Sequence, residues 1–365
     1  MSTADFMPLD GWDHVELWVG NAKQSAYFYE RAFGFHRTAY AGPETGVRDR
    51  ASYVLEQGDV RFVVTSGLRR DSPICEFACL HGDGLKDIAL RVPDAREAYR
   101  EAVQRGARGI REPGWVEDEF GRVELASIAT YGDVVHTFVN RSEYEGAYLP
   151  GYRAEESANG ARGVGLLQID HVVGNVELGR MEHWVSFYER VFGMTEMKHF
   201  SDEDISTEYS ALMSKVMTDG KGKIKFPINE PAEGKRKSQI EEYLEFNAGP
   251  GSQHVAMSTA NIVETVQSLK RRGVLFLETP DAYYEDMPQR VGEIDEDYAD
   301  LRRLRILADR DDDGYLLQIF TKTAQDRPTL FFEVIERHGA RGFGDGNFKA
   351  LFEAIEREQA LRGNL

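Results

Sequence analysis

The feature that most constrains this chain of 365 residues is an internal repeat. Residues 13–16 read DHVE and residues 27–35 read YFYERAFGF, while residues 170–173 read DHVV and residues 186–194 read SFYERVFGM. The histidine and the last glycine of the motif are 20 residues apart in the first copy and 22 in the second. A match this long indicates a duplicated unit, so both halves of the chain are expected to fold alike.

The pattern within each copy predicts strands and helices in the same order. Each copy starts with a short apolar run typical of a strand, followed by a segment with aromatic residues at helical spacing that stops at a glycine. A second strand and helix are expected at 87–105 in the first half and at 254–272 in the second. Each half is expected to close with a glycine turn and an apolar strand, at 134–139 and at 316–321. This order predicts an α+β fold with two βαβββ modules in each half.

The polar stretch 151–163 lacks apolar periodicity and is the expected boundary between two domains, 1–155 and 160–365. Near the C-terminus, apolar residues at 348, 351, 352 and 355 lie at the spacing of one helix face. The first half has no counterpart of this helix. We therefore expect an added helix that covers a pocket in the second domain as a lid.

The composition excludes several classes of partner. The formal net charge is −18, which opposes binding to nucleic acid or to an anionic membrane. The sequence has no run of about 18 apolar residues, and its first 20 residues lack the pattern of a signal peptide. Two cysteines do not make a disulfide framework, so a cytoplasmic location is expected.

A candidate metal site emerges when the two halves are compared at matching positions. The first strand carries His14 in one half and His171 in the other, but the later strand carries Asp87 in one and His254 in the other. The second half also has Glu333 inside an apolar strand, where an unpaired charge would cost several kcal/mol. Two imidazoles and a carboxylate form the facial triad of non-haem Fe(II) oxygenases, although imidazole also suits zinc. The first half is expected to lack a metal.

Several long segments make the sequence resemble the 4-hydroxyphenylpyruvate dioxygenases of the vicinal-oxygen-chelate superfamily. These are FPINEP at 226–231, KSQIEEY at 237–243, QH at 253–254, DDGYLLQIF at 312–320 and GFGDGNFKALF at 342–352. The resemblance implies a glyoxalase-like open β-barrel in each half. It also implies that His171, His254 and Glu333 hold Fe(2+).

The resemblance further implies a substrate pocket and a reaction. The implied substrate-binding residues are Ser210, Asn229, Gln239, Gln253, Gln318, Phe320, Phe331, Phe343, Asn347, Phe348 and Phe352. Among them, Asn229, Gln239 and Phe348 are expected to take part in catalysis. The implied reaction converts 4-hydroxyphenylpyruvate and O2 to homogentisate and CO2 in tyrosine catabolism. The small-molecule substrate and O2 are the expected partners, with a homodimer or homotetramer as the expected assembly.

Three alternative functions stay open at this point. A 4-hydroxymandelate synthase uses the same substrate and iron but hydroxylates the benzylic carbon. An extradiol ring-cleaving dioxygenase shares the superfamily, and a metal-free binding protein would share only the fold. The segment 228–231 and Phe348 favour hydroxylation of the ring, and the intact ligand set argues against the metal-free alternative.

Overall fold

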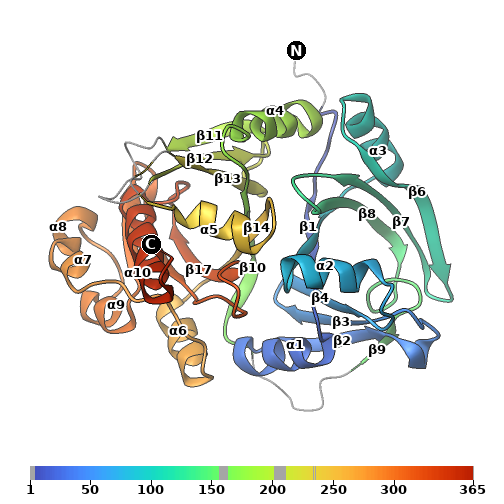
Figure 1. The fold of residues 1–365 in the computed structure, drawn as a ribbon, viewed down its shortest axis with the longest axis horizontal. Helices are drawn as coiled ribbons and strands as arrows, with labels where there is room; N and C mark the ends of the chain where they lie inside the picture. The colour runs from blue at the N-terminus through green and yellow to red at the C-terminus, as the bar shows by residue number, and fades with distance from the viewer. Residues whose placement is uncertain (1–4, 156–162, 201–210, 233, 235, 365) are drawn as a thin grey trace.

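In the computed structural model, which describes residues 5–155, 163–200, 211–232, 234 and 236–364, the strands form two curled sheets that lie side by side (Figure 1). We call residues 5–155 the first half and residues 163–364 the second half. The sheet of the first half has nine strands among the described residues, and the sheet of the second half has eight. None of the described helices has the length and apolar character that a membrane span requires.

Both halves contain two modules with the predicted order. In the first half the elements are β1 (Gly11–Trp18), α1 (Ala22–Phe28), β2 (His36–Ala41), β3 (Arg50–Gln57), β4 (Val60–Gly67), α2 (Pro73–His81), β5 (Gly84–Arg91), α3 (Ala95–Gln104), β6 (Gly109–Asp118), β7 (Gly121–Ala129), β8 (Val135–Tyr144) and β9 (Arg153–Ala154), with a π-helical turn at Tyr29–Phe33 and a 3-10 turn at Pro43–Thr45.

In the second half the elements are β10 (Leu166–Asn175), α4 (Met181–Phe192), β11 (Thr195–Phe200), β12 (Ala211–Thr218), β13 (Lys225–Ala232), α5 (Gln239–Phe246), β14 (Gly251–Thr259), α6 (Ile262–Arg271), α7 (Ala282–Glu285), α8 (Met287–Val291), α9 (Tyr298–Leu304), β15 (Leu307–Asp311), β16 (Gly314–Phe320), β17 (Phe331–His338) and α10 (Asp345–Arg362). The expected βαβββ order is confirmed, with α7, α8 and α9 inserted into the last module.

The two sheets have the same topology. Their orders are β6-β7-β8-β5-β1-β4-β3-β2-β9 and β11-β12-β13-β10-β14-β17-β16-β15. In each sheet the first strands of the two modules pair antiparallel at the centre, as β1 with β5 and β10 with β14. The last strand of each module then pairs in parallel with that module's first strand. The α+β glyoxalase-like fold with a curled, open sheet in each half is therefore as predicted.

The expected closing strand of the second half was wrong. Residues 316–321 largely form β16, whereas the strand that pairs with β14 is β17. The counterpart of β8 is thus β17, the strand that carries Glu333. Both β16 and β17 are apolar, and only the parallel pairing with β14 distinguishes the strand that returns to the centre of the sheet.

The two motif glycines end their helices as predicted. Gly34 and Gly193 both adopt left-handed backbone angles, with φ values of 74° and 69°. A residue with a Cβ atom would be strained there. In the first half, the π-helical turn joins α1 to Gly34.

The halves share one hydrophobic core, because the central strands of each sheet turn one face toward the other half. Val172 on β10, Val255 on β14 and Phe332 on β17 belong to the same buried cluster as residues of the first half. The Phe332 ring contacts the rings of Tyr29 and Phe62, at centroid distances of 5.7 Å each. The first half therefore supports the strands of the second half from behind.

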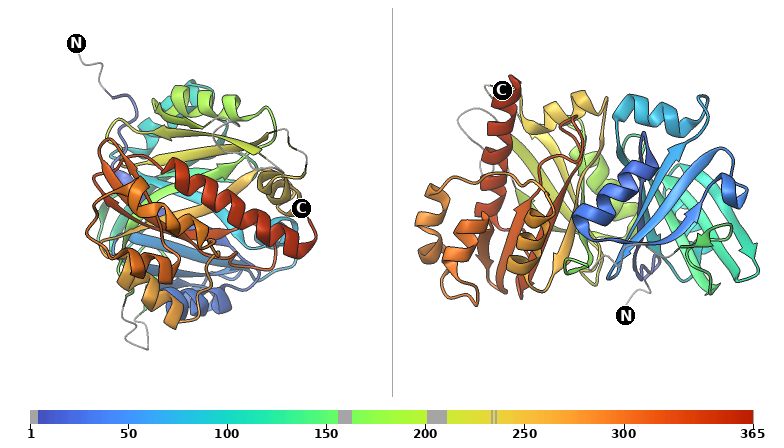
Figure 2. Two further views of the ribbon diagram at one scale, coloured as in Figure 1. Left: turned by 90° about the vertical axis from the view of Figure 1, so that its left-hand side faces the viewer. Right: turned by 90° about the horizontal axis from the view of Figure 1, so that it is seen from below.

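Helix α10 lies on the side of the second sheet that faces away from the first half (Figure 2). It spans Asp345–Arg362, which extends the predicted helix by three residues at each end. Arg362 at its end binds the buried Glu242 of α5 through two nitrogens, at 3.1 and 2.6 Å. The expected cover over the second sheet is thus present.

A glycine at the contact between the halves allows a first prediction. Gly132 has a φ of +59°, and a Cβ atom there would lie 2.1 Å from the backbone oxygen of Pro250. Gly179 has a φ of +76° with nothing within 4 Å of its Cβ position. Gly179→Ala should cost about 1–2 kcal/mol of unfolding free energy, and Gly132→Ala about 1–3 kcal/mol more. Urea denaturation measures both, and equal losses would contradict a close approach at Gly132.

Candidate metal centre

Three adjacent strands at the centre of the second sheet carry the predicted ligands. His171 lies on β10, His254 on β14 and Glu333 on β17, and these strands are neighbours in the sheet. Because side chains alternate along a strand, Phe332 points into the shared core while Glu333 points to the opposite face. The alternation that builds the core therefore also sets the ligands on one face.

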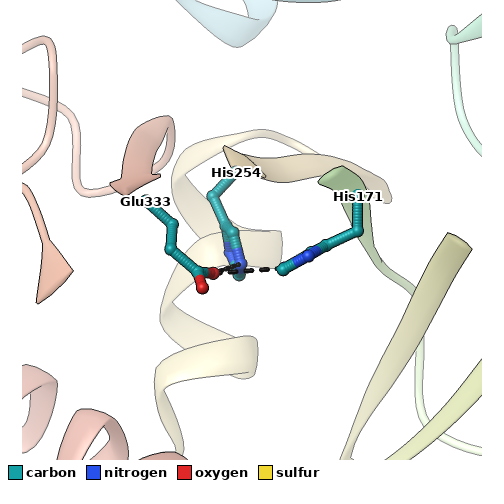
Figure 3. A group of neighbouring side chains, drawn as sticks. All are labelled: His171, His254 and Glu333. Atoms are coloured by element: carbon teal, nitrogen blue, oxygen red, sulfur yellow. Dashed lines mark ion pairs between the residues drawn. The ribbon is translucent and has the colours of Figure 1, made fainter. Parts of the chain in front are cut away.

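The three side chains converge (Figure 3). Oε2 of Glu333 lies 3.1 Å from Nε2 of His171 and 3.4 Å from Nε2 of His254. One candidate ligand atom from each residue lies within 4.8 Å of the other two. All three residues are at most 5% exposed, so the carboxylate is shielded from water.

Hydrogen bonds fix the orientation of each candidate ligand. Nδ1 of His171 faces Oδ1 of Asp170 at 2.8 Å, and Nδ1 of His254 faces Oε1 of Gln253 at 3.1 Å. Because these oxygens accept a proton, Nδ1 of each ring is the donor and Nε2 is left to bind a cation. Gln318 donates to Oε1 of Glu333 at 2.8 Å, so Oε2 turns toward the histidines.

The ionisation of the group follows from burial and from its partners. Burial would raise the pKa of Glu333, but the charge and hydrogen bonds of the two histidines lower it to about 2. Burial lowers the pKa of His171, yet Glu333 and Asp170 outweigh it and raise that pKa. At His254 burial prevails and lowers the pKa. The carboxylate is therefore ionised, and a buried negative charge attracts a cation.

The donor set fits the metal that the resemblance implies. Two imidazole nitrogens and one carboxylate oxygen on one face leave other positions open, which suits Fe(II). A second group, Glu296, Glu336 and His338, is only partly buried. Its Glu336 already accepts a hydrogen bond from the backbone N–H of Ile262, at the start of α6, at 2.7 Å. We therefore consider only the first group as a metal site.

A cavity of about 290 Å³ opens directly onto the three candidate ligands. Its wall includes four of the predicted pocket residues and part of α10: Gln318, Phe320, Phe343, Phe348 and Leu351. The Phe343 ring meets the His171 ring edge-on at 4.8 Å, and the Phe331 ring stacks on the His254 ring at 4.6 Å. Aromatic side chains thus surround the candidate metal position.

The structure places other predicted residues beside this cavity instead of in it. Gln239, Gln253 and Phe331 line a neighbouring cavity of about 520 Å³. Phe331 therefore contributes to its wall while it also stacks on His254. Asn347 donates to Gln318 at 2.9 Å and so supports the residue that binds Glu333. Phe352 lines neither cavity and packs in an apolar cluster with Phe343.

Buried polar atoms mark a further part of this pocket. Asn229 on β13 pairs in register with Asn175 on β10 and Ser214 on β12. Oδ1 of Asn229, Nδ2 of Asn175, Oγ of Ser214 and Oε1 of Gln239 are buried without a hydrogen-bond partner in the described part of the chain. Unpaired buried groups of this kind are costly, and a polar ligand would satisfy them.

Sequence reasoning missed Ser214 and Asn175. The predicted Ser210 lies outside the described residues, whereas Ser214 sits directly across the ladder from Asn229. Alternation along 212–216, with Ser214 between two leucine and valine side chains, was the available signal. Asn175 was visible in the repeat, but only strand pairing brings it to Asn229.

Comparison with known proteins identifies the family. The Glyoxalase/Bleomycin resistance protein/Dioxygenase superfamily matches residues 168–319, and the N-terminal part of hydroxyphenylpyruvate dioxygenase matches residues 4–150. The 4-hydroxyphenylpyruvate dioxygenases of Yarrowia lipolytica and Dictyostelium discoideum are each 47% identical to this chain. These matches cover 97% and 98% of this chain, and 93% and 100% of the relatives. The chain belongs to the 4-hydroxyphenylpyruvate dioxygenase family.

Other members of the 4-hydroxyphenylpyruvate dioxygenase family and a solved structure agree with this assignment. The Danio rerio enzyme is 46% identical over 96% of this chain and 91% of its own length. A mutant of 4-hydroxymandelate synthase from Streptomyces coelicolor superposes with a TM-score of 0.86, at 36% identity, over 97% of this chain and 100% of its own. The fold is thus shared with an enzyme of different printed activity.

The first half of this dioxygenase-family chain keeps the positions of the three candidate ligands but not their chemistry. His14 is the counterpart of His171, Asp87 of His254 and, by the parallel pairing of β5 with β8, Thr137 of Glu333. Asp87 accepts hydrogen bonds from the backbone N–H and the hydroxyl of Thr137. Burial raises the pKa of Asp87 to about 6, although His14 and Thr137 partly offset the effect.

This raised pKa makes the stability of the protein depend on pH. Asp87 in the folded chain binds a proton more tightly than in the unfolded chain, so its contribution is present below about pH 4 and is lost as the pH rises through about 6. Asp87→Asn should raise the unfolding free energy at pH 7 by about 1–3 kcal/mol and flatten its pH dependence between 4 and 6. Denaturation at several pH values tests this, with the exposed Asp71→Asn as control. Unchanged pH dependence would refute it.

Proposed function

We propose that this protein is a 4-hydroxyphenylpyruvate dioxygenase that converts 4-hydroxyphenylpyruvate and O2 to homogentisate and CO2. The observation that carries the proposal is a buried group of two histidines and a glutamate in a chain similar over nearly its full length to enzymes of that name. An aromatic wall and unpaired polar atoms beside this group match a substrate with one ring, one phenol and one 2-oxo acid.

In this proposal His171, His254 and Glu333 hold Fe(II), and residues 1–155 form a domain without metal beside a catalytic domain, 160–365. When bound, Fe(II) would supply the open positions for a 2-oxo acid and O2 and the electrons that activate O2. The chain supplies one anionic and two neutral ligands, each held by a hydrogen-bonded neighbour. A site with this ligand charge keeps a net positive charge for an anionic substrate.

The other residues of the pocket would orient the substrate and exclude water. Neutral amides such as Asn229 and Gln239 can hydrogen-bond a phenol without adding charge, and their unpaired oxygens are free acceptors for its proton. Phe343 and Phe348 would press on the ring and keep water from the reacting atoms. Since Phe331 lies between the amides and the metal position, substrate entry would require its ring to move.

Two broader properties are also part of the proposal. The free thiols of Cys75 and Cys79 support a reducing, cytoplasmic location. A homodimer or homotetramer rests on the resemblance to the family alone.

The second candidate function is that of a 4-hydroxymandelate synthase, because a structure of that name superposes closely. It is 36% identical to this chain, whereas the dioxygenases of Yarrowia lipolytica and Dictyostelium discoideum reach 47%. Incubation with 4-hydroxyphenylpyruvate, Fe(II), ascorbate and O2, followed by chromatography, separates the two. Homogentisate supports the proposal, and 4-hydroxymandelate as the main product would replace it with the second candidate.

The ligand assignment predicts a loss of iron in one variant. Glu333→Ala removes the anionic ligand of a buried group, so the variant should fold but bind almost no Fe(II) and form no product. Mass spectrometric metal analysis and circular dichroism measure the two properties. His14→Ala is the matched control in the first half and should keep its iron, at a cost of about 1–3 kcal/mol in stability. Near-stoichiometric iron in Glu333→Ala would refute the assignment.

The cavity wall predicts a change of product in a second variant. Phe348 is the residue of α10 whose ring faces the candidate ligands, and misplacement of a substrate by about 1 Å is enough to slow or redirect a positioned reaction. Phe348→Ile should still bind Fe(II) and release CO2, but it should form less homogentisate and more benzylic or unrearranged product. Chromatography at matched O2 uptake measures the ratio.

The control for this variant makes the same chemical change elsewhere. Phe192→Ile alters a buried ring of α4 that packs on Tyr188, outside both cavities. It should lower stability and leave the product ratio unchanged. Homogentisate alone, at the parent rate, from Phe348→Ile would show that Phe348 only fills space.

A further inference from the structure

An arginine on β17 holds the carboxylate that orients His171. Nε and Nη2 of Arg337 each lie 2.8 Å from the two oxygens of Asp170, and Asp170 accepts the hydrogen bond from Nδ1 of His171. Lys225 contributes a further positive charge, at 3.5 Å from both oxygens of Asp170. Arg337 and Asp170 are both largely buried, so this two-pronged ion pair is shielded from solvent.

The same guanidinium also holds the chain segment that leads to α10. Nη1 of Arg337 donates to the carbonyl oxygen of Gly342 at 2.6 Å and to that of Ala340 at 3.3 Å. Its carbon lies 5.5 Å from the centre of the Phe343 ring. That ring in turn packs edge-on against His171. Arg337 therefore contacts both the support of a candidate ligand and the segment that covers it.

The first half repeats this arrangement around His14. Arg141, four residues after Thr137 as Arg337 is four after Glu333, binds Asp13 through Nε and Nη2 at 2.8 and 2.6 Å. Asp13 lies 2.7 Å from Nδ1 of His14. Nη1 of Arg141 donates to the carbonyl oxygen of Tyr148, whose ring lies 5.5 Å from the guanidinium and packs edge-on against His14.

The repeat separates two roles of the arginine. In the first half the aspartate, histidine, arginine and aromatic ring are all kept, although Asp87 and Thr137 stand where the second half has His254 and Glu333. There the arrangement only fastens a loop across the sheet. In the second half the fastened loop continues into α10, and the histidine is a candidate ligand. The same contacts thus join the covering helix to the metal position.

We propose that Arg337 is a positioning residue that couples the orientation of His171 to the closure of α10 over the metal site. The proposal rests on the proposed function, since it takes His171 as a ligand. Through Asp170, Arg337 keeps the bare Nε2 of His171 directed at the site. Through Gly342, it sets where Phe343 and the start of α10 lie. No other side chain type offers three nitrogens in this fixed geometry, and a lysine offers one.

The test uses the full chain with three variants: Arg337→Met, Arg337→Lys and the matched control Arg141→Met. Anaerobic titration of the metal-free protein measures the Kd for Fe(II), and hydrogen exchange of metal-free protein measures protection of 345–362. Arg337→Met should weaken Fe(II) binding about 10–100-fold and speed exchange in α10. Arg141→Met breaks the equivalent contacts in the first half and should change neither quantity.

Each outcome decides the proposal. Arg337→Met with the parent Kd and the parent exchange would overturn it, as would equal losses in Arg141→Met, which would indicate a general loss of stability. If Arg337→Met fails to fold, Arg337→Lys carries the test: it keeps a charge beside Asp170 but should still speed exchange in α10, and parent exchange would overturn the coupling. If the parent protein itself binds no Fe(II), the proposed function fails instead.

Discussion

An ionised carboxylate buried at the centre of a sheet is the constraint on which the second half depends. Glu333 has a lowered pKa although it is shielded from water, because two imidazoles face one of its oxygens and Gln318 donates to the other. Removing either type of partner would leave a buried charge uncompensated, which costs several kcal/mol. The surrounding side chains are therefore arranged for charge as much as for packing.

The strands that carry this group are held from behind by the first half. Phe332 and Glu333 are neighbours on β17, one in the shared core and the other in the site. Close packing on one face of a strand fixes the side chains on its other face. The first half contributes Tyr29 and Phe62 to the packing against Phe332, so it serves the site without touching it.

The duplication has been used asymmetrically. Both halves keep an aspartate, a histidine and an arginine linked in the same way, but only the second half has a second imidazole and a carboxylate at the next positions. In the first half Asp87 and Thr137 satisfy each other by hydrogen bonds, so that position needs no cation. The comparison shows how few substitutions separate a sheet that supports from a sheet that is built to bind.

The sequence by itself determined the repeat, the module order and the three candidate ligands, because periodicity, glycine caps and a lone carboxylate among apolar residues are local features. It did not determine that β17 closes the second sheet, that Ser214 faces Asn229, or that Phe352 packs away from the cavity. Those facts depend on which strands pair and in which register, and a shift of one residue would reverse every side chain. Only the tertiary structure decided them, since pairing joins residues far apart in the chain.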